Sequence, residues 1–309
     1  MFKGIAKSHT MKKVLSQANR FASIPRPVLI RGERGTGKEL MARFIHNSSP
    51  RLDKPFVAIN CAAFNDQLLN SEIYGHEKGA FTGADSRRIG QLERADKGTL
   101  FMDEIGNMSV DFQEKILRVM EYQKFQRISG SEMIEVDVRI VSATNANLEE
   151  MMDEDLFRRD LYDRLTFAEI VIPPLRQRRE DIPHLIVHFV RKLHEEIPNI
   201  PQRTFKRETV EQMMDYYWPG NIRELKNVVE RVYLYGEENV IYPDSLPKGV
   251  GGLDQEIVGH SFDEKVDAFK KKLILEAYDK FDKNQKRAAK NLEMTYDQYR
   301  HFFRKYQKS

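Results

Sequence analysis

The sequence predicts an α/β protein: a doubly wound parallel sheet with helices on both faces, followed by smaller all-helical parts. Five short apolar runs rich in β-branched residues recur in the first half, separated by longer helix-like stretches, at residues 27–30, 56–59, 99–102, 138–141 and 169–172. Strands that alternate with helices form parallel sheets covered on both faces. After Pro173 and Pro174 only helical periodicity continues. We therefore expect a sheet domain over residues 1–173.

The residues after the sheet divide into three further segments. Apolar residues near helical period predict helices over 181–196, 209–217 and 222–235, so that residues 174–240 form a helical lid. Residues 241–262 hold prolines and a glycine-rich stretch and are expected to be a linker. The remaining segment, 263–309, is expected to be a separate all-α domain.

The composition is that of an ordinary globular protein. The 309 residues are 40% hydrophobic and 31% charged. No apolar run approaches the length that spans a bilayer, and the first residues lack a signal-peptide pattern, so we expect a cytoplasmic protein without membrane insertion. Cys61 is the one cysteine, which excludes an internal disulfide, and its apolar neighbours predict a small buried side chain.

The charge is distributed unevenly along the chain. Residues 263–309 carry 13 Lys or Arg against 8 Asp or Glu, a balance of +5, which leaves 37 against 39, or −2, in the rest. A basic excess at one end is typical of nucleic-acid contact, although a solvated surface gives the same signal.

A phosphate-binding loop follows the first expected strand and begins a helix. It comprises residues 32–38: Gly32, Glu33, Arg34, Gly35, Thr36, Gly37 and Lys38. Glycines let successive N–H groups turn inward, the helix N-terminus adds positive potential, and the lysine can reach the β and γ phosphates. This order of strand, loop and helix predicts ATP as the cofactor. The alternative is a glycine-rich turn without a ligand.

Two acidic residues follow the buried run at 99–102. Asp103 is expected to hold Mg²⁺ and Glu104 to polarise the attacking water, unless both are mere surface acids. The Ser or Thr that usually follows the loop lysine is replaced by Glu39. How Mg²⁺ is bound without that hydroxyl is left open between water, Thr36 and another group.

With these motifs placed, the chain resembles the AAA+ ATPase domain of sigma-54-dependent bacterial transcription activators, the enhancer-binding proteins. The most specific element is the signature loop, residues 79–84: Gly79, Ala80, Phe81, Thr82, Gly83 and Ala84. Residues 157–161 and 218–225 match as well, and so does Glu39. The resemblance implies that the signature loop contacts sigma-54 RNA polymerase. A phenyl ring on a thin, bendable loop suits insertion into a partner's apolar pocket; the alternative is a buried turn with Phe81 in the core.

The resemblance also implies roles for residues around the nucleotide. Arg158 and Arg164 match arginine fingers that reach a neighbouring subunit's ATP, unless they are ordinary helix-surface residues. Thr144 and Asn145 match sensor I, Arg223 matches sensor II, and Asn60 matches a switch partner of Glu104. Because fingers make a lone subunit incomplete, the active form is expected to be a homo-hexamer.

The last segment predicts a helix-turn-helix that binds enhancer DNA, and it resembles the Fis-type domain that ends many of these activators. Small Ala288 and Ala289 would let two helices cross closely. The residues expected near DNA are Lys286, Arg287, Thr295, Tyr296, Gln298, Tyr299, Arg300 and Arg304. The alternative is a helix pair used for packing or dimerisation.

These features predict an ATP-driven activator that remodels the sigma-54 polymerase closed complex. Because the ATPase begins almost at Met1 in this sequence, control by a trans-acting inhibitor protein is expected. Two alternatives are a DNA-binding regulator in which ATP only sets the oligomeric state, and an unrelated ring ATPase of replication or protein unfolding. The signature loop argues against both.

Overall fold

The computed structural model describes residues 6–197, 199–236, 238–247, 249–250, 270–271, 274–275, 277–278, 281, 284–292 and 294–307. The chain divides into two compact units, residues 1–241 and 242–309, which are described separately below.

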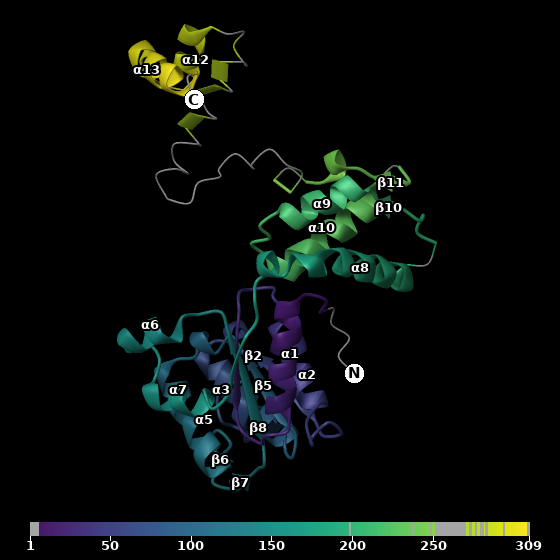
Figure 1. Ribbon diagram of the computed structural model, residues 1–309. Coiled ribbons are helices and arrows are strands. Elements are labelled where there is room, and N and C mark those ends of the chain that lie inside the picture. The colour runs from purple at the N-terminus through teal and green to yellow at the C-terminus, as the bar shows by residue number, and fades with distance from the viewer. Residues whose placement is uncertain are drawn as a thin grey trace. The chain divides into compact units, whose positions relative to one another are not determined.

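The first unit is built on a five-stranded parallel sheet (Figure 1). Its strands are β1 (Val28–Arg31), β2 (Phe56–Asn60), β5 (Thr99–Asp103), β8 (Arg139–Thr144) and β9 (Glu169–Val171), in the order β2-β5-β8-β1-β9. All five expected runs are therefore strands of one parallel sheet, as predicted. In this order β5, β8 and β1 are neighbours in the middle of the sheet. Because the strands are parallel, the carboxyl ends of these three strands lie side by side.

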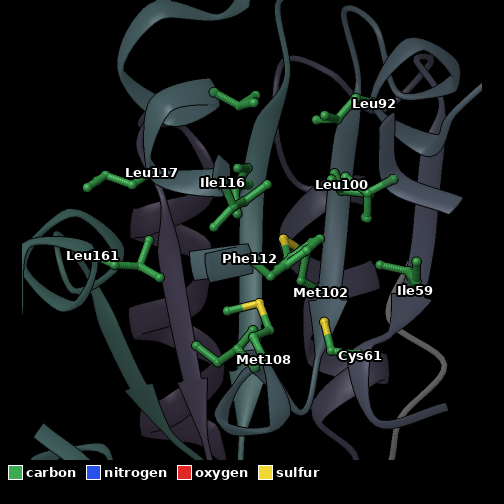
Figure 2. Close-up of a cluster of buried hydrophobic side chains, with 14 of the residues drawn as sticks. Ile59, Cys61, Leu92, Leu100, Met102, Met108, Phe112, Ile116, Leu117 and Leu161 are labelled. Carbon is green, nitrogen blue, oxygen red and sulfur yellow. The ribbon is translucent and has the colours of Figure 1, made fainter. Parts of the chain in front are cut away.

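Helices cover both faces of this sheet, because alternate strand residues point to opposite sides. Val28 and Ile30 pack with buried residues of α1 (His9–Ala22) and α2 (Lys38–Asn47). Leu29 belongs to the opposite core, formed with α3 (Asp66–Tyr74), α4 (Gln91–Arg94), α5 (Val110–Tyr122), α6 (Leu148–Asp153) and α7 (Arg159–Leu165). Figure 2 shows part of this second core, including Cys61, which is 1% exposed as expected. Burial raises the pKa of the Cys61 thiol to about 12.

Three short ladders lie outside the main sheet. β3 (Gly75–His76) pairs with β4 (Arg88–Ile89), and β6 (Lys124–Gln126) pairs with β7 (Met133–Glu135), both antiparallel. β10 (Thr204–Phe205) pairs in parallel with β11 (Val240–Ile241). The expectation of helices alone after Pro174 is therefore wrong, since a two-residue ladder is too short to leave a periodic signal.

The lid consists chiefly of α8 (Ile182–Glu196), α9 (Arg207–Asp215) and α10 (Asn221–Tyr235), close to the three expected helices. Its centre is Trp218, fully buried, whose indole N–H donates to the carbonyl of Met213 at 2.6 Å.

Short 3-10 turns occur along the whole chain, at η1 (Cys61–Ala63), η2 (Ile105–Asn107), η3 (Leu175–Gln177), η4 (Arg179–Asp181) and η5 (Pro243–Ser245). Across the described part of the chain, each helix is too short or too polar to span a bilayer.

The helix α1 is fastened at both ends. At its start, the buried carboxylate of Asp181 accepts hydrogen bonds from the backbone N–H groups of Lys7 and Ser8, at 2.6 and 2.8 Å. At its end, the guanidinium of Arg139 donates to the carbonyls of Phe21 and Ala22, both at 2.7 Å. A carboxylate at a helix N-terminus and a cation at its C-terminus both favour the helix dipole.

The second unit contains α12 (Gln285–Asn291) and α13 (Tyr296–Gln307). Ala288 and Ala289 are buried, in keeping with the expectation that they allow close packing, and they share a small core with Tyr299, Phe303 and Tyr306. Of the expected linker 241–262, residues 248 and 251–262 lie outside the described residues, as do residues 263–269 of the expected DNA-binding domain.

Candidate functional site

The phosphate loop connects β1 to α2 with the backbone shape that anion binding requires. Gly35 and Gly37 have φ of +76° and +100°, values that favour glycine. Gly37 caps α2 without a side-chain bond, so the first N–H groups of α2 lack intrahelical partners and provide an anion site. Lys38 is 6% exposed, and its Nζ donates to the carbonyl of Gly32 at 3.0 Å. The backbone of the loop therefore has the shape that phosphate binding requires.

Glu104, which directly follows β5, lies close to Lys38. Its Oε1 is 3.5 Å from Lys38 Nζ. When the Asn145 amide is oriented to satisfy its surroundings, its nitrogen donates to both Glu104 oxygens, with Oε1 at 3.0 Å. Glu104 itself has φ of +55°, and its N–H donates to Asp103 Oδ1 at 3.0 Å. The structure thus brings Lys38, Asp103, Glu104 and Asn145 together.

The donor set fits Mg²⁺ at Asp103. Burial and then the adjacent Glu104 raise the pKa of the Asp103 carboxyl, and a cation would offset both effects. The described residues contain no cluster of three His, Cys, Asp or Glu that could hold a metal alone. Mg²⁺ is commonly bound through one or two carboxylates, substrate phosphates and water. Glu39 pairs with Arg43 at 2.9 Å on an exposed surface, and the Thr36 hydroxyl donates a hydrogen bond to the backbone carbonyl of Glu33 at 2.8 Å.

Two residues expected from the resemblance sit nearby in other roles. Asn60 lies opposite Asp103 in the β2–β5 register, but its Oδ1 accepts the N–H of Ala62 at 2.9 Å and begins the turn η1. Within the described residues no hydrogen bond joins Asn60 to Glu104. Thr144 is buried, and its Oγ1 accepts the N–H of Ala146 at 3.0 Å. Thr144 therefore shapes the turn that carries Asn145.

The lid touches the phosphate loop directly. A methyl group placed on Gly35 would lie 2.3 Å from the carbonyl oxygen of Gly220 and 3.2 Å from Arg223 Cβ. Arg223, expected as sensor II, therefore lies beside the loop at the start of α10. The close approach explains why Gly35 cannot carry a side chain.

The signature loop is a closed turn between β3 and β4. Gly79 N–H donates to the Ala84 carbonyl at 2.8 Å, and Ala84 N–H donates to the Phe81 carbonyl at 3.0 Å. The Phe81 ring is half-buried against His76 and belongs to neither core of the sheet, whereas Thr82 is exposed. Ala84 was expected to contact sigma-54. The structure corrects this expectation, because the Ala84 side chain is 5% exposed and closes the base of the loop.

Sequence reasoning missed the ion-pair network beneath this loop. Arg127, 5% exposed, donates to Glu77 Oε1 and to Glu93 Oε1, each at 2.9 Å. These contacts raise the pKa of Arg127, Glu93 first. A single arginine between two short strands carries no motif, so only the fold reveals that it joins three segments.

The expected arginine fingers contact acids of their own chain. Arg158 Nη2 donates to Asp160 Oδ2, and Arg164 Nη2 donates to Glu121 Oε1, both at 2.8 Å. Arg158 lines an open concavity of about 1090 Å³ along α5 and the β6–β7 hairpin. Among the described residues, neither arginine is hydrogen-bonded or ion-paired to the phosphate loop of the same chain.

The second unit presents most of the expected DNA-binding residues to solvent: Lys286, Arg287, Thr295, Tyr296, Gln298, Arg300 and Arg304. Thr295 and Gln298 form a reciprocal capping box at the start of α13, with bonds of 3.1 and 3.3 Å. Tyr299 is a correction: it is fully buried, and its hydroxyl donates to the Ile274 carbonyl at 2.7 Å. Tyr299 therefore packs the unit's core and cannot contact DNA.

A parallel sheet with a phosphate loop, an acidic pair at the end of β5 and a helical lid define an AAA+ ATPase domain. Comparison with protein families agrees: the sigma-54 interaction domain matches residues 5–171, and the AAA+ ATPase lid domain matches residues 176–256. The chain belongs to the sigma-54 interaction domain family, as the resemblance in the sequence implied.

Several transcription regulators are similar to this chain. The Psp operon transcriptional activator of Escherichia coli K12 is 42% identical over 318 residues, covering 98% of this chain and 97% of that protein. The Nif-specific regulatory protein of Azospirillum lipoferum is 48% identical over 242 residues, which are 78% of this chain and only 38% of that longer protein. The crystal structure of Brucella abortus NtrX in complex with ATP has a TM-score of 0.75 and 32% identity, covering 99% of this chain and 69% of that one.

Proposed function

We propose that this chain is a sigma-54-dependent transcription activator that uses ATP hydrolysis to remodel the sigma-54 RNA polymerase closed complex. The observation that carries the proposal is the signature loop, present intact on a domain whose phosphate loop and acidic pair are also intact. An ATPase site supplies the energy, and a loop with an aromatic residue and an exposed threonine supplies the contact. The long similarity to the Psp operon transcriptional activator supports the same function.

Each site residue has its own proposed part in ATP hydrolysis. Lys38 and the N-terminus of α2 would bind the phosphate oxygens. Asp103 would hold Mg²⁺, which when bound would supply positive charge to the transferred phosphoryl group. Glu104 orients and polarises the attacking water. Since Glu104 now contacts Lys38 and Asn145, nucleotide binding would have to draw Lys38 toward phosphate and leave Glu104 with Asn145.

Energy transfer to the signature loop is proposed to pass through β2. Asn60 ends this strand beside Asp103, and the turn that it caps leads into α3, which in turn leads to β3 and the loop. A contact between Asn60 and Glu104 that forms with one nucleotide and breaks with another would move this path. The tip of the loop would then engage sigma-54 in one nucleotide state only.

The active assembly is proposed to be a homo-hexameric ring. In the described part of the chain, the guanidinium groups of Arg158 and Arg164 pair with surface carboxylates, and their side chains are 33% and 53% exposed. Guanidinium groups held in this way can be transferred to a neighbouring subunit's γ phosphate, where they stabilise the transition state.

The second unit is proposed to bind enhancer DNA as a helix-turn-helix, with α13 in the major groove. The exposed Arg300 and Arg304, one helical turn apart, support this placement. Control by an inhibitor protein in trans is also part of the proposal. The main alternative is a DNA-binding regulator in which ATP only sets the oligomeric state.

The deciding experiment is open-complex formation by sigma-54 polymerase with Thr82→Ala. We expect normal ATP hydrolysis and loss of activation, because Thr82 is exposed on the signature loop and is not one of the residues proposed to act in hydrolysis. Ser86→Ala, an exposed position just outside the signature loop, is the matched control and should activate normally. A Thr82→Ala protein that hydrolyses ATP and still activates would refute the motor function and favour the alternative.

A further inference from the structure

The outer side of the phosphate loop is bonded to the lid and to the segment that leads into it. Asn221, at the start of α10, donates through Nδ2 to the carbonyl of Arg34 at 3.0 Å and to Glu33 Oε2 at 3.1 Å. Ile222 N–H donates to the carbonyl of Gly35 at 3.0 Å, and Arg178 Nη2 donates to the carbonyl of Thr36 at 2.9 Å. Four consecutive loop residues, 33–36, are thus each fixed from this side.

Asn221 is the centre of these contacts. It is fully buried, and its Oδ1 accepts the N–H of Leu175 at 2.7 Å, so a single carboxamide joins the loop, the connector after β9 and the lid. Its φ of +52° is a conformation that asparagine tolerates better than most residues. Asparagine therefore satisfies a backbone requirement and a bonding requirement that few other side chains could meet together.

Glu33 poses an electrostatic problem that the same contacts solve. A carboxylate within a phosphate loop repels the anionic ligand if it turns toward it. Here Arg176 binds Glu33 through two parallel bonds, with Nη1 to Oε2 at 2.8 Å, and stacks over Tyr217 at 4.5 Å. The bidentate pair fixes the carboxylate in direction as well as in charge. Arg176 also lowers the pKa of Glu33, so that the pair remains ionised at neutral pH.

We propose that Asn221, Arg176 and Glu33 are positioning residues for nucleotide binding: they set the shape of the phosphate loop from the lid side and keep the Glu33 carboxylate away from the phosphates. This inference rests on the proposed ATP-binding function. If the three residues act in this way, nucleotide affinity depends on the position of the lid relative to the phosphate loop. The reason is that the loop carbonyls and Glu33 are hydrogen-bonded to groups of the lid and of the connector. The three side chains act on the shape and charge of the phosphate loop, and not by touching the nucleotide.

The first test is the affinity of full-length protein for a fluorescent ADP analogue, together with KM and kcat for ATP. Asn221→Asp keeps the bond to Leu175 and the tolerance of positive φ but removes both donors to the loop. We expect affinity to fall about tenfold, the loss that one hydrogen bond to a charged group brings, with kcat at saturation changed much less. Asn239→Asp, an exposed lid position beside β11, introduces the same charge as a matched control.

The second test separates positioning from direct contact. Arg176→Ala should weaken binding of the analogue, and adding Glu33→Gln should recover several-fold, because the freed carboxylate is the cause of the loss. If Arg176 touched the nucleotide itself, Glu33→Gln would recover nothing. This pair also keeps the inference testable if Asn221→Asp does not fold.

The outcomes are distinguishable. Unchanged affinity in Asn221→Asp, an equal loss in Asn239→Asp, or no recovery in the double variant would each overturn the positioning role while leaving ATP binding intact. Failure of the unaltered protein to bind the analogue, or unchanged binding in Lys38→Ala, would instead overturn the proposed function.

Discussion

The ring of Phe81 lies 4.9 Å from the imidazole of His76, inclined at 64° to it. His76 is itself buried, and its Nδ1 is hydrogen-bonded to Ser71 Oγ at 2.8 Å. The aromatic residue of the signature loop is therefore docked on a fixed group of β3 and is not free in solvent. An edge-to-face pair of this kind is worth about 0.5–1.5 kcal/mol, small enough for a nucleotide-driven movement to break.

His76→Ala is expected to release the loop. Without its partner ring, Phe81 loses the contact that holds residues 79–84 down, so amide hydrogen exchange in this segment should accelerate several-fold. The measurement is exchange followed by mass spectrometry of the loop peptide. His184→Ala, an exposed histidine on α8, should leave exchange in the loop unchanged. Slow exchange in His76→Ala would mean that backbone bonds alone hold the loop.

Arg127→Ala is expected to destabilise the sheet domain by about 3 kcal/mol, because it leaves Glu93 and Glu77 without their buried partner. Urea unfolding measures the change. Arg118→Ala removes a surface ion pair with Glu114 in which the Arg118 side chain is 69% exposed. This change should lower the free energy of unfolding by less than about 0.5 kcal/mol. Similar losses in both variants would show that the Arg127 network is no stronger than a surface pair.

Asp103→Asn is expected to stabilise the unliganded protein at neutral pH by about 1 kcal/mol while abolishing ATP hydrolysis. The pKa of Asp103 is raised in the folded state by burial and by Glu104, so the folded protein binds a proton more readily than the unfolded chain. Stability from this group therefore falls as pH rises through that raised pKa and is regained in acid. The advantage of Asp103→Asn should shrink as pH falls, which thermal unfolding across pH can check.

Mixing two inactive proteins tests whether Arg158 acts in trans. Arg158→Ala subunits keep Glu104, and Glu104→Ala subunits keep Arg158, so mixed rings contain some complete sites and should recover part of the ATPase activity. Each variant alone should be nearly inactive. Absence of recovery at every mixing ratio would contradict the assignment of Arg158 to a neighbouring subunit's site.

Tyr299 and Arg300 are adjacent in sequence but should behave differently. Tyr299→Phe removes the bond to Ile274 and is expected to cost about 1 kcal/mol of stability without changing DNA affinity in the folded protein. Under the proposed DNA-binding role, Arg300→Ala should weaken binding to enhancer DNA and reduce its salt dependence, since it would remove a phosphate or base contact. Titrations at several salt concentrations distinguish the two, and a salt slope unchanged in Arg300→Ala would place α13 away from DNA.

The sequence was sufficient for features that depend on local pattern. The five strands follow from apolar runs between turns, and the phosphate loop from glycines at fixed spacing after one of them. Contacts between distant segments were harder to predict from the sequence. The Asn221–Glu33 hydrogen bond joins residues 188 positions apart, and the sequence around either residue gives no indication of the other. Tyr299 was misplaced for a related reason. A helix face can be assigned from periodicity, but whether a tyrosine on it packs inward depends on residues such as Ile274 in another segment.

The fastening of α1 by Asp181 and Arg139 has a mechanical consequence. Asp181 directly precedes the first lid helix, and Pro173 and Pro174 leave the preceding connector little backbone freedom. A rotation of the lid must therefore either break the bonds from Lys7 and Ser8 or carry the start of α1 with it. A movement of the lid is thus transmitted to the sheet by two routes, through β9 and through α1, and α1 forms a second rigid connection between the two.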